Sequence, residues 1–111
     1  MEKRRILILA ADSALHTSLA ERLCLDGMHV VDRPESPANP GVNLVIAVCD
    51  SWPAPWTLEL LRSHFRTVSC LLLSGSPVSG PYLAATFRRG YFLALPTSGR
   101  RIANLARTLV A

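Results

Sequence analysis

No stretch of this sequence is long and apolar enough to cross a lipid bilayer. A spanning helix needs about 20 consecutive, mainly apolar residues, and the longest apolar runs here are broken by polar residues or proline. The amino terminus is basic, but the apolar segment after it ends at Asp12, which makes it a poor secretory signal. We therefore expect a cytoplasmic protein with no membrane partner.

Cysteine is scarce, and its spacing is not that of a metal site. The three cysteines are Cys24, Cys49 and Cys70, an odd number at no metal-ligand spacing, and all three have apolar neighbours in the sequence. We expect reduced cysteines that belong to the apolar core.

Acidic residues are outnumbered, 8 to 12, so the net charge is +4. Arginines gather at Arg88–Arg89 and at Arg100–Arg101. A solvated basic surface is the favoured interpretation, and an acidic protein partner is the alternative. Nucleic-acid binding is not favoured, because a charge of +4 without interleaved exposed aromatic residues is a weak signal for it.

Hydrophobic residues make up 50% of the chain, which argues against disorder. Its 111 residues match the commonest size of a single domain and can bury one core. We expect residues 1–111 to form one domain, without repeats or linkers.

The apolar run Leu44–Cys49 is the most informative part of the sequence. It is short, rich in β-branched residues and without alternation, which is typical of a strand buried on both faces of a parallel sheet. Asp50 follows it directly, and open α/β sheets bind ligands at the carboxyl ends of their strands. Asp50 is therefore the first candidate site residue, and a plain strand end or helix cap is the alternative.

Other segments predict strands that alternate with helices. Strands are expected over 5–10, 28–31, 68–73 and 91–95, and helices over about 14–26, 58–65, 81–89 and from Thr97 or Ser98 onward. This order predicts a parallel, doubly wound sheet. Residues 32–41 hold three prolines, so we expect no helix, or only a very short one, between the second and third strands.

Helical spacing also predicts which side chains are buried. The expected apolar face of the first helix consists of Leu15, Leu19, Leu23 and Cys24, with Gly27 as its stop. The last helix is expected to bury Ile102, Leu105, Leu109 and Val110. Gly90 is expected to end the helix over 81–89. His29 is interpreted as a polar residue of an edge strand.

The order of these elements, together with several short strings, resembles the receiver domain of bacterial two-component response regulators. The strings are Arg5–Leu9 followed by Ala10–Leu15, then Leu58–Arg62, Leu73–Ser74–Gly75 and Leu95–Pro96. The resemblance covers nearly the whole chain. It implies a flavodoxin-like sheet with strand order 2-1-3-4-5.

The resemblance also implies a chemistry that this chain largely lacks. A working receiver uses an aspartate as phosphoryl acceptor, an acidic pair that holds Mg²⁺, a lysine and a hydroxyl. Here Ala10 and Ala11 stand at the acidic pair, with Asp12 just beyond, and Leu95 stands at the lysine. The acceptor position falls on Cys49, one residue before Asp50, and one residue reverses the direction of a strand side chain.

Two positions keep the residue types that the resemblance implies. Ser74 matches the switch hydroxyl, and Phe92 matches the strand-five aromatic residue that moves with it. The signalling surface that the resemblance implies would carry Arg88, Arg89, Arg100 and Arg101.

We therefore expect a pseudo-receiver: a non-enzymatic signalling module that binds a protein partner or a second copy of itself. No cofactor is expected, and Mg²⁺ only if Asp12 and Asp50 converge. The alternatives are phosphorylation on Asp50, a redox sensor at Cys49 and a nucleic-acid-binding module. Flavin binding is least favoured, since no phosphate-cradling loop follows the first strand.

Overall fold

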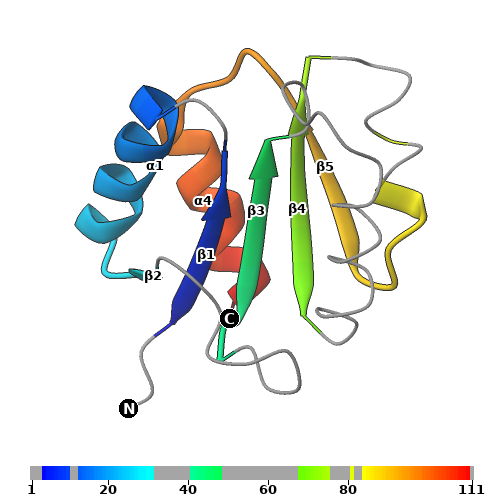
Figure 1. Ribbon diagram of the computed structural model, residues 1–111, viewed down its shortest axis with the longest axis horizontal. Coiled ribbons are helices and arrows are strands. Elements are labelled where there is room, and N and C mark those ends of the chain that lie inside the picture. The colour runs from blue at the N-terminus through cyan, green and yellow to red at the C-terminus, as the bar shows by residue number, and fades with distance from the viewer. Residues whose placement is uncertain are drawn as a thin grey trace.

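A computed structural model describes residues 4–10, 13–31, 41–48, 68–75, 81 and 84–110 (Figure 1). Its strands are β1 (Arg5–Leu9), β2 (His29–Val31), β3 (Leu44–Val48), β4 (Ser69–Ser74) and β5 (Gly90–Ala94), and its helices are α1 (Ser13–Leu25) and α4 (Gly99–Val110). No helix in these ranges is long and apolar enough to cross a membrane.

The five strands form one parallel sheet in the order β2-β1-β3-β4-β5. This confirms the predicted flavodoxin-like topology. The expected absence of a helix between the second and third strands concerns residues 32–40, which lie outside the described residues. The helix expected over 58–65 lies outside them as well.

Helices α1 and α4 lie together on one face of the sheet (Figure 1). Side chains of both helices join alternate strand residues in one apolar layer. This first layer contains Ile6, Ile8, Leu19, Leu23, Met28, Leu44, Ile46, Val48, Leu71, Leu73, Leu93, Ile102, Ala103 and Ala106. Because strand side chains alternate, the intervening residues point to the opposite face.

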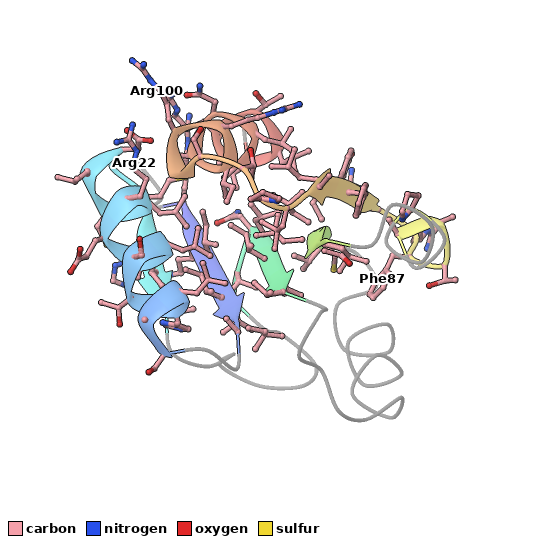
Figure 2. The ribbon with its side chains drawn as sticks, turned by 90° about the horizontal axis from the view of Figure 1, so that it is seen from above. Arg22, Phe87 and Arg100 are labelled. Atoms are coloured by element: carbon pink, nitrogen blue, oxygen red, sulfur yellow. The ribbon has the colours of Figure 1, made fainter. Side chains whose placement is uncertain are left out.

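The opposite face of the sheet carries a second apolar layer. It contains Leu7, Val45, Ala47, Cys70, Leu72, Ala84 and Phe87. Figure 2 shows Phe87 on the side of the sheet away from α1. All residues of β3 and β4 are therefore buried, as the unbroken apolar runs predicted.

Helix α1 ends at Leu25, and Gly27 follows it as the predicted stop. Gly27 has a φ of +84°, the Gly27 N–H donates to the Cys24 carbonyl, and the Met28 N–H donates to the Leu23 carbonyl, both at 3.0 Å. This Schellman pattern uses carbonyls that the helix leaves free.

The predicted burial of α1 is right for Leu19 and Leu23 and wrong for Cys24. Leu19 and Leu23 are buried, Leu15 is half-buried, and Cys24 is exposed. One residue turns an α-helix by about 100°, so Cys24 points away from the sheet that Leu23 contacts. Cys70 is buried as expected, and Cys49 lies outside the described residues.

The helix expected to run to Arg89 is shorter than predicted. Ala84 and Ala85 are helical, and a turn begins at Thr86. The Arg89 carbonyl already accepts the Cys70 N–H, so the chain has to leave the helix before β5. Gly90 is the first residue of β5 rather than a helix stop.

A close backbone approach explains the glycine at position 90. A Cβ atom there would lie 2.0 Å from the Ala84 carbonyl oxygen and 2.9 Å from Phe87 Cβ. No larger residue fits without movement of the turn.

Of the two residues predicted to begin the last helix, Thr97 and Ser98, it is Ser98 that caps α4. The Ser98 hydroxyl accepts a hydrogen bond from the Arg101 N–H at 3.2 Å. Ile102 is buried as expected, whereas Leu105, Leu109 and Val110 are half-buried. The fully buried positions are Ala103 and Ala106. A hydrophobic pattern gives little weight to alanine, but a small side chain lets a helix approach its neighbours closely.

Candidate functional site

The carboxyl ends of the parallel strands meet at one edge of the sheet, where α/β proteins bind ligands. Figure 1 shows β1 and β3 pointing toward this edge. The described residues there include Ala10 after β1, Ser74 at the end of β4, and Leu95 after β5. Asp12, Cys49 and Asp50 lie outside the described residues, so convergence of Asp12 with Asp50 stays a prediction.

Ser74 is the last residue of β4 and is 3% exposed. Its backbone carbonyl accepts a hydrogen bond from the Leu95 N–H at 2.9 Å. This bond continues the β4–β5 ladder to the edge, so the backbone of Ser74 is held in place. Ser74 is thus a buried polar residue at the position where the sequence predicted a switch hydroxyl.

Phe92 lies on the same face of the sheet as Ser74. Ser74 pairs with Ala94 and Leu72 pairs with Phe92, and alternate residues of a strand share one face. Phe92 is half-buried and packs against the second apolar layer. The structure therefore brings the two predicted switch residues to adjacent strands, with the Leu73–Leu93 pair between them along the ladder.

Ala10 and Leu95 stand where the resemblance expects a carboxylate and a lysine. Both are half-buried and pack against the first apolar layer. The Leu95–Pro96 peptide bond is cis. These two positions extend the apolar core to the carboxyl edge and supply neither a carboxylate ligand nor a fixed cation.

The described residues at this edge do not suit Mg²⁺. This ion prefers carboxylate and other oxygen ligands in near-octahedral geometry. Between Arg4 and Val110, the described ranges contain no group of three histidine, cysteine, aspartate or glutamate residues that could hold a metal ion. We derive no step through magnesium for this reason.

The four arginines of the expected signalling surface form two separate pairs. Arg88 and Arg89 precede the amino end of β5. Arg100 and Arg101 lie beyond the carboxyl end of β5, in the first turn of α4. All four are exposed. A five-residue strand is about 16 Å long, and Figure 2 shows Arg100 and Phe87, which precedes Arg88, on opposite sides of the molecule.

Arg22 is a further basic residue that sequence reasoning missed. Its Cγ atom lies 3.5 Å from where a Cβ of Gly99 would be, and Figure 2 shows it beside Arg100. It therefore adds a third cation near the start of α4. Helical spacing alone does not predict that Arg22 of α1 lies beside Gly99 of α4.

The described cysteines differ in burial, since Cys24 is exposed and Cys70 is buried. Burial raises the pKa of the Cys70 thiol to about 12, and its Sγ atom lies 3.7 Å from the Val68 carbonyl oxygen. A thiol with so high a pKa forms little thiolate at neutral pH. Cys70 is therefore a structural residue, while the redox hypothesis concerned Cys49.

Solved structures of response-regulator receivers share this architecture. No protein-family profile and no curated protein matches the sequence. A CheY-like receiver domain protein from Methanospirillum hungatei JF-1 is 17% identical, with a TM-score of 0.79 over 98% of this chain and 94% of that one.

Two further solved structures have the same sequence identity and somewhat lower TM-scores. The non-phosphorylated HemR receiver domain from Leptospira biflexa is 17% identical, with a TM-score of 0.77 over 98% of this chain and 95% of that chain. HP1043, an orphan response regulator of H. pylori, is 17% identical, with a TM-score of 0.73 over 97% of each chain. Identities this low establish a shared fold and leave the function to the site. The chain therefore has the fold of the response-regulator receiver domain.

Proposed function

We propose that this chain is a receiver-like signalling module that binds a protein partner without needing aspartyl phosphorylation. The observation that carries the proposal is the packing of Ala10 and Leu95 against the first apolar layer. Phosphoryl transfer depends on positioned charges around the phosphoryl oxygens. At these two positions the chain has apolar packing instead.

The retained fold supports a binding role. Receivers are compact modules that pass a signal through their surface, and here the central strands β3 and β4 are fully buried. The exposed arginines Arg88, Arg89, Arg100 and Arg101 suit a partner with acidic side chains. We propose that the module acts in the cytoplasm and that its role is binding rather than catalysis.

Labelling with a small phosphate donor tests this function. The full chain is incubated with acetyl phosphate and Mg²⁺, and intact-protein mass spectrometry measures phosphoryl incorporation. We expect no stable adduct. Stoichiometric, hydroxylamine-sensitive labelling that is lost in Asp50→Asn would overturn the proposal.

A double substitution makes the same test sharper. Ala10→Asp with Leu95→Lys restores the residue types that the resemblance implies at two positions. If missing charges are the reason for inactivity, this variant gains labelling that the unaltered chain lacks. Urea unfolding checks that the variant folds, because both side chains pack against the apolar core.

A further inference from the structure

Strand β5 forms one end of the sheet that the described strands build, and none of these strands pairs with its outer backbone edge. Among the described strands, β4 is its one hydrogen-bonded neighbour. The opposite end is formed by β2, which has three residues, whereas β5 has five. A strand at the end of a sheet leaves a row of N–H and C=O groups without partners, and such a row can pair with another chain.

The register shows which backbone groups of β5 are free. The Cys70 N–H donates to the Arg89 carbonyl, and the Leu95 N–H donates to the Ser74 carbonyl, both at 2.9 Å. In a parallel ladder, alternate residues direct both backbone groups to the same neighbour, so odd-numbered residues face β4. Gly90, Phe92 and Ala94 consequently direct their N–H and C=O groups outward. Within the described part of the chain, none of the three bonds on that side.

Nothing in the sequence of β5 protects this edge. Natural end strands are commonly protected by charged side chains, proline or a bulge. The strand reads Gly-Tyr-Phe-Leu-Ala and contains neither a charge nor a proline. Of the three outward residues, Ala94 is exposed and Gly90 and Phe92 are half-buried, and the side chain of Tyr91 between them is 41% exposed.

The outward groups make β5 complementary to itself. An antiparallel alignment centred on Phe92 places Phe92 opposite Phe92 of a second copy and Gly90 opposite Ala94. Bonded and non-bonded pairs alternate in such a ladder, so all three outward residues of each copy fall on bonded positions. We propose that two copies of this chain associate through the β5 edge, joining their sheets across a two-fold axis.

Charge favours the antiparallel direction. Arg88 and Arg89 precede β5, and this alignment places them opposite the uncharged Pro96 and Leu95 of the second copy. A parallel alignment would place each arginine opposite the same arginine of the second copy, and like charges directly opposite each other destabilise a strand pair. Antiparallel pairing also places Tyr91 opposite Leu93 at a non-bonded pair, where side chains approach most closely.

The dimer identifies a second copy of the chain as one partner in the proposed binding function. The dimer pairs the backbone of Phe92, a predicted switch residue, but it does not use Asp50, Asp12 or the Ser74 hydroxyl. Labelling by acetyl phosphate would overturn the proposed function and leave the dimer in place, whereas a strictly monomeric chain would overturn the dimer alone.

Sedimentation velocity over a range of concentrations tests the dimer. We expect the mass to rise from 12.1 kDa toward twice that value. Amide hydrogen exchange at high concentration should show new protection at the Phe92 and Ala94 N–H groups. A mass of 12.1 kDa at every concentration, or a dimer with both amides unprotected, would overturn the proposal.

A pair of charge variants at one exposed position tests the alignment. Residue 94 lies diagonally across from Arg88 of the second copy, within reach of a long side chain. Ala94→Lys should therefore weaken dimerisation, and Ala94→Glu should dimerise about tenfold more tightly than Ala94→Lys. Equal affinities at low salt would contradict the alignment.

A proline variant tests the backbone pairing itself. The Ala94 N–H points away from β4, so Ala94→Pro removes an outward donor without removing a bond of the ladder. We expect loss of the dimer in Ala94→Pro and its retention in Ala94→Val, with urea unfolding as the check on folding. Full dimerisation of a folded Ala94→Pro variant contradicts the proposal. If that variant does not fold, the dimer affinities of Ala94→Lys and Ala94→Glu test the proposal instead.

Discussion

Strands β4 and β5 pair with each other residue by residue, yet their surroundings differ completely. All six residues of β4 are buried, whereas β5 has one buried residue, Leu93. Their compositions are similar, since Ser-Cys-Leu-Leu-Leu-Ser and Gly-Tyr-Phe-Leu-Ala are both apolar and uncharged. The position in the sheet therefore decides burial, because among the described strands β4 has a neighbour on either side and β5 has one.

This difference suggests that β4 serves the stability of the fold and β5 serves the interaction with a partner. β4 contributes side chains to both apolar layers, so its residues hold the fold together. In β5, Tyr91 and Leu93 direct their backbone groups to β4, whereas the outward groups of Gly90, Phe92 and Ala94 are those proposed to bind a second copy. Three experiments can sharpen or break this division, in order of decreasing effect.

Truncation in β4 should have the largest effect. Leu72 is fully buried in the second layer, and Leu72→Ala should lower the free energy of unfolding by about 2–5 kcal/mol. Tyr91→Ala in β5 should lower it by less than about 1 kcal/mol. Urea unfolding at low protein concentration measures both, and similar losses would refute the division.

A methyl group at the start of β5 should have the next effect. In Gly90→Ala the new Cβ would lie 2.0 Å from the Ala84 carbonyl oxygen, and the required shift should cost about 3 kcal/mol. Gly27→Ala is the matched control, because Gly27 has a positive φ but no atom within 4 Å of a Cβ, and about 1 kcal/mol is expected there. Thermal or urea unfolding of Gly90→Ala and Gly27→Ala shows whether steric space or the backbone φ angle is what requires glycine at each position.

The smallest effect concerns the Cys70 thiol of β4. Burial raises its pKa from 9.0 to about 12, so between these values the unfolded chain releases a proton that the folded chain keeps. Stability should therefore fall as the pH rises from about 9 toward 12, and Cys70→Ala should reduce this fall. At neutral pH, iodoacetamide followed by peptide mass analysis should modify Cys24 readily and Cys70 only after unfolding. Equal rates for the two thiols in the folded chain would be inconsistent with this burial.

The sheet was predictable because its signals are local and strong. Short apolar runs alternate with helix signals, and the handedness of parallel crossovers leaves few arrangements. The facing of Ser74 and Phe92 follows from the same alternation once β4 and β5 are paired. Their role as switch residues stays a prediction, as do the roles of Asp12, Cys49 and Asp50.

Other features depend on packing that no local pattern encodes. Sequence spacing placed Cys24 in the core, although the sheet contacts the helix along the direction of Leu19 and Leu23. The end of the helix near Thr86 is set by the bond between Cys70 and Arg89. Arg22 lies beside α4, with its Cγ atom 3.5 Å from where a Cβ of Gly99 would be, and no local sequence pattern indicates this.

The division of the core into two layers has a consequence for combined mutations. Val45 and Ile46 are adjacent in the sequence but belong to different layers, while Ile46 and Leu71 pair on neighbouring strands within one layer. Energetic coupling arises between residues that are in contact or that share a cavity, a hydrogen-bond network or a backbone shift. The side chains of Ile46 and Leu71 lie in one layer, so a double-mutant cycle should give this pair a larger coupling energy than Val45 and Ile46, whose side chains lie on opposite faces of the sheet.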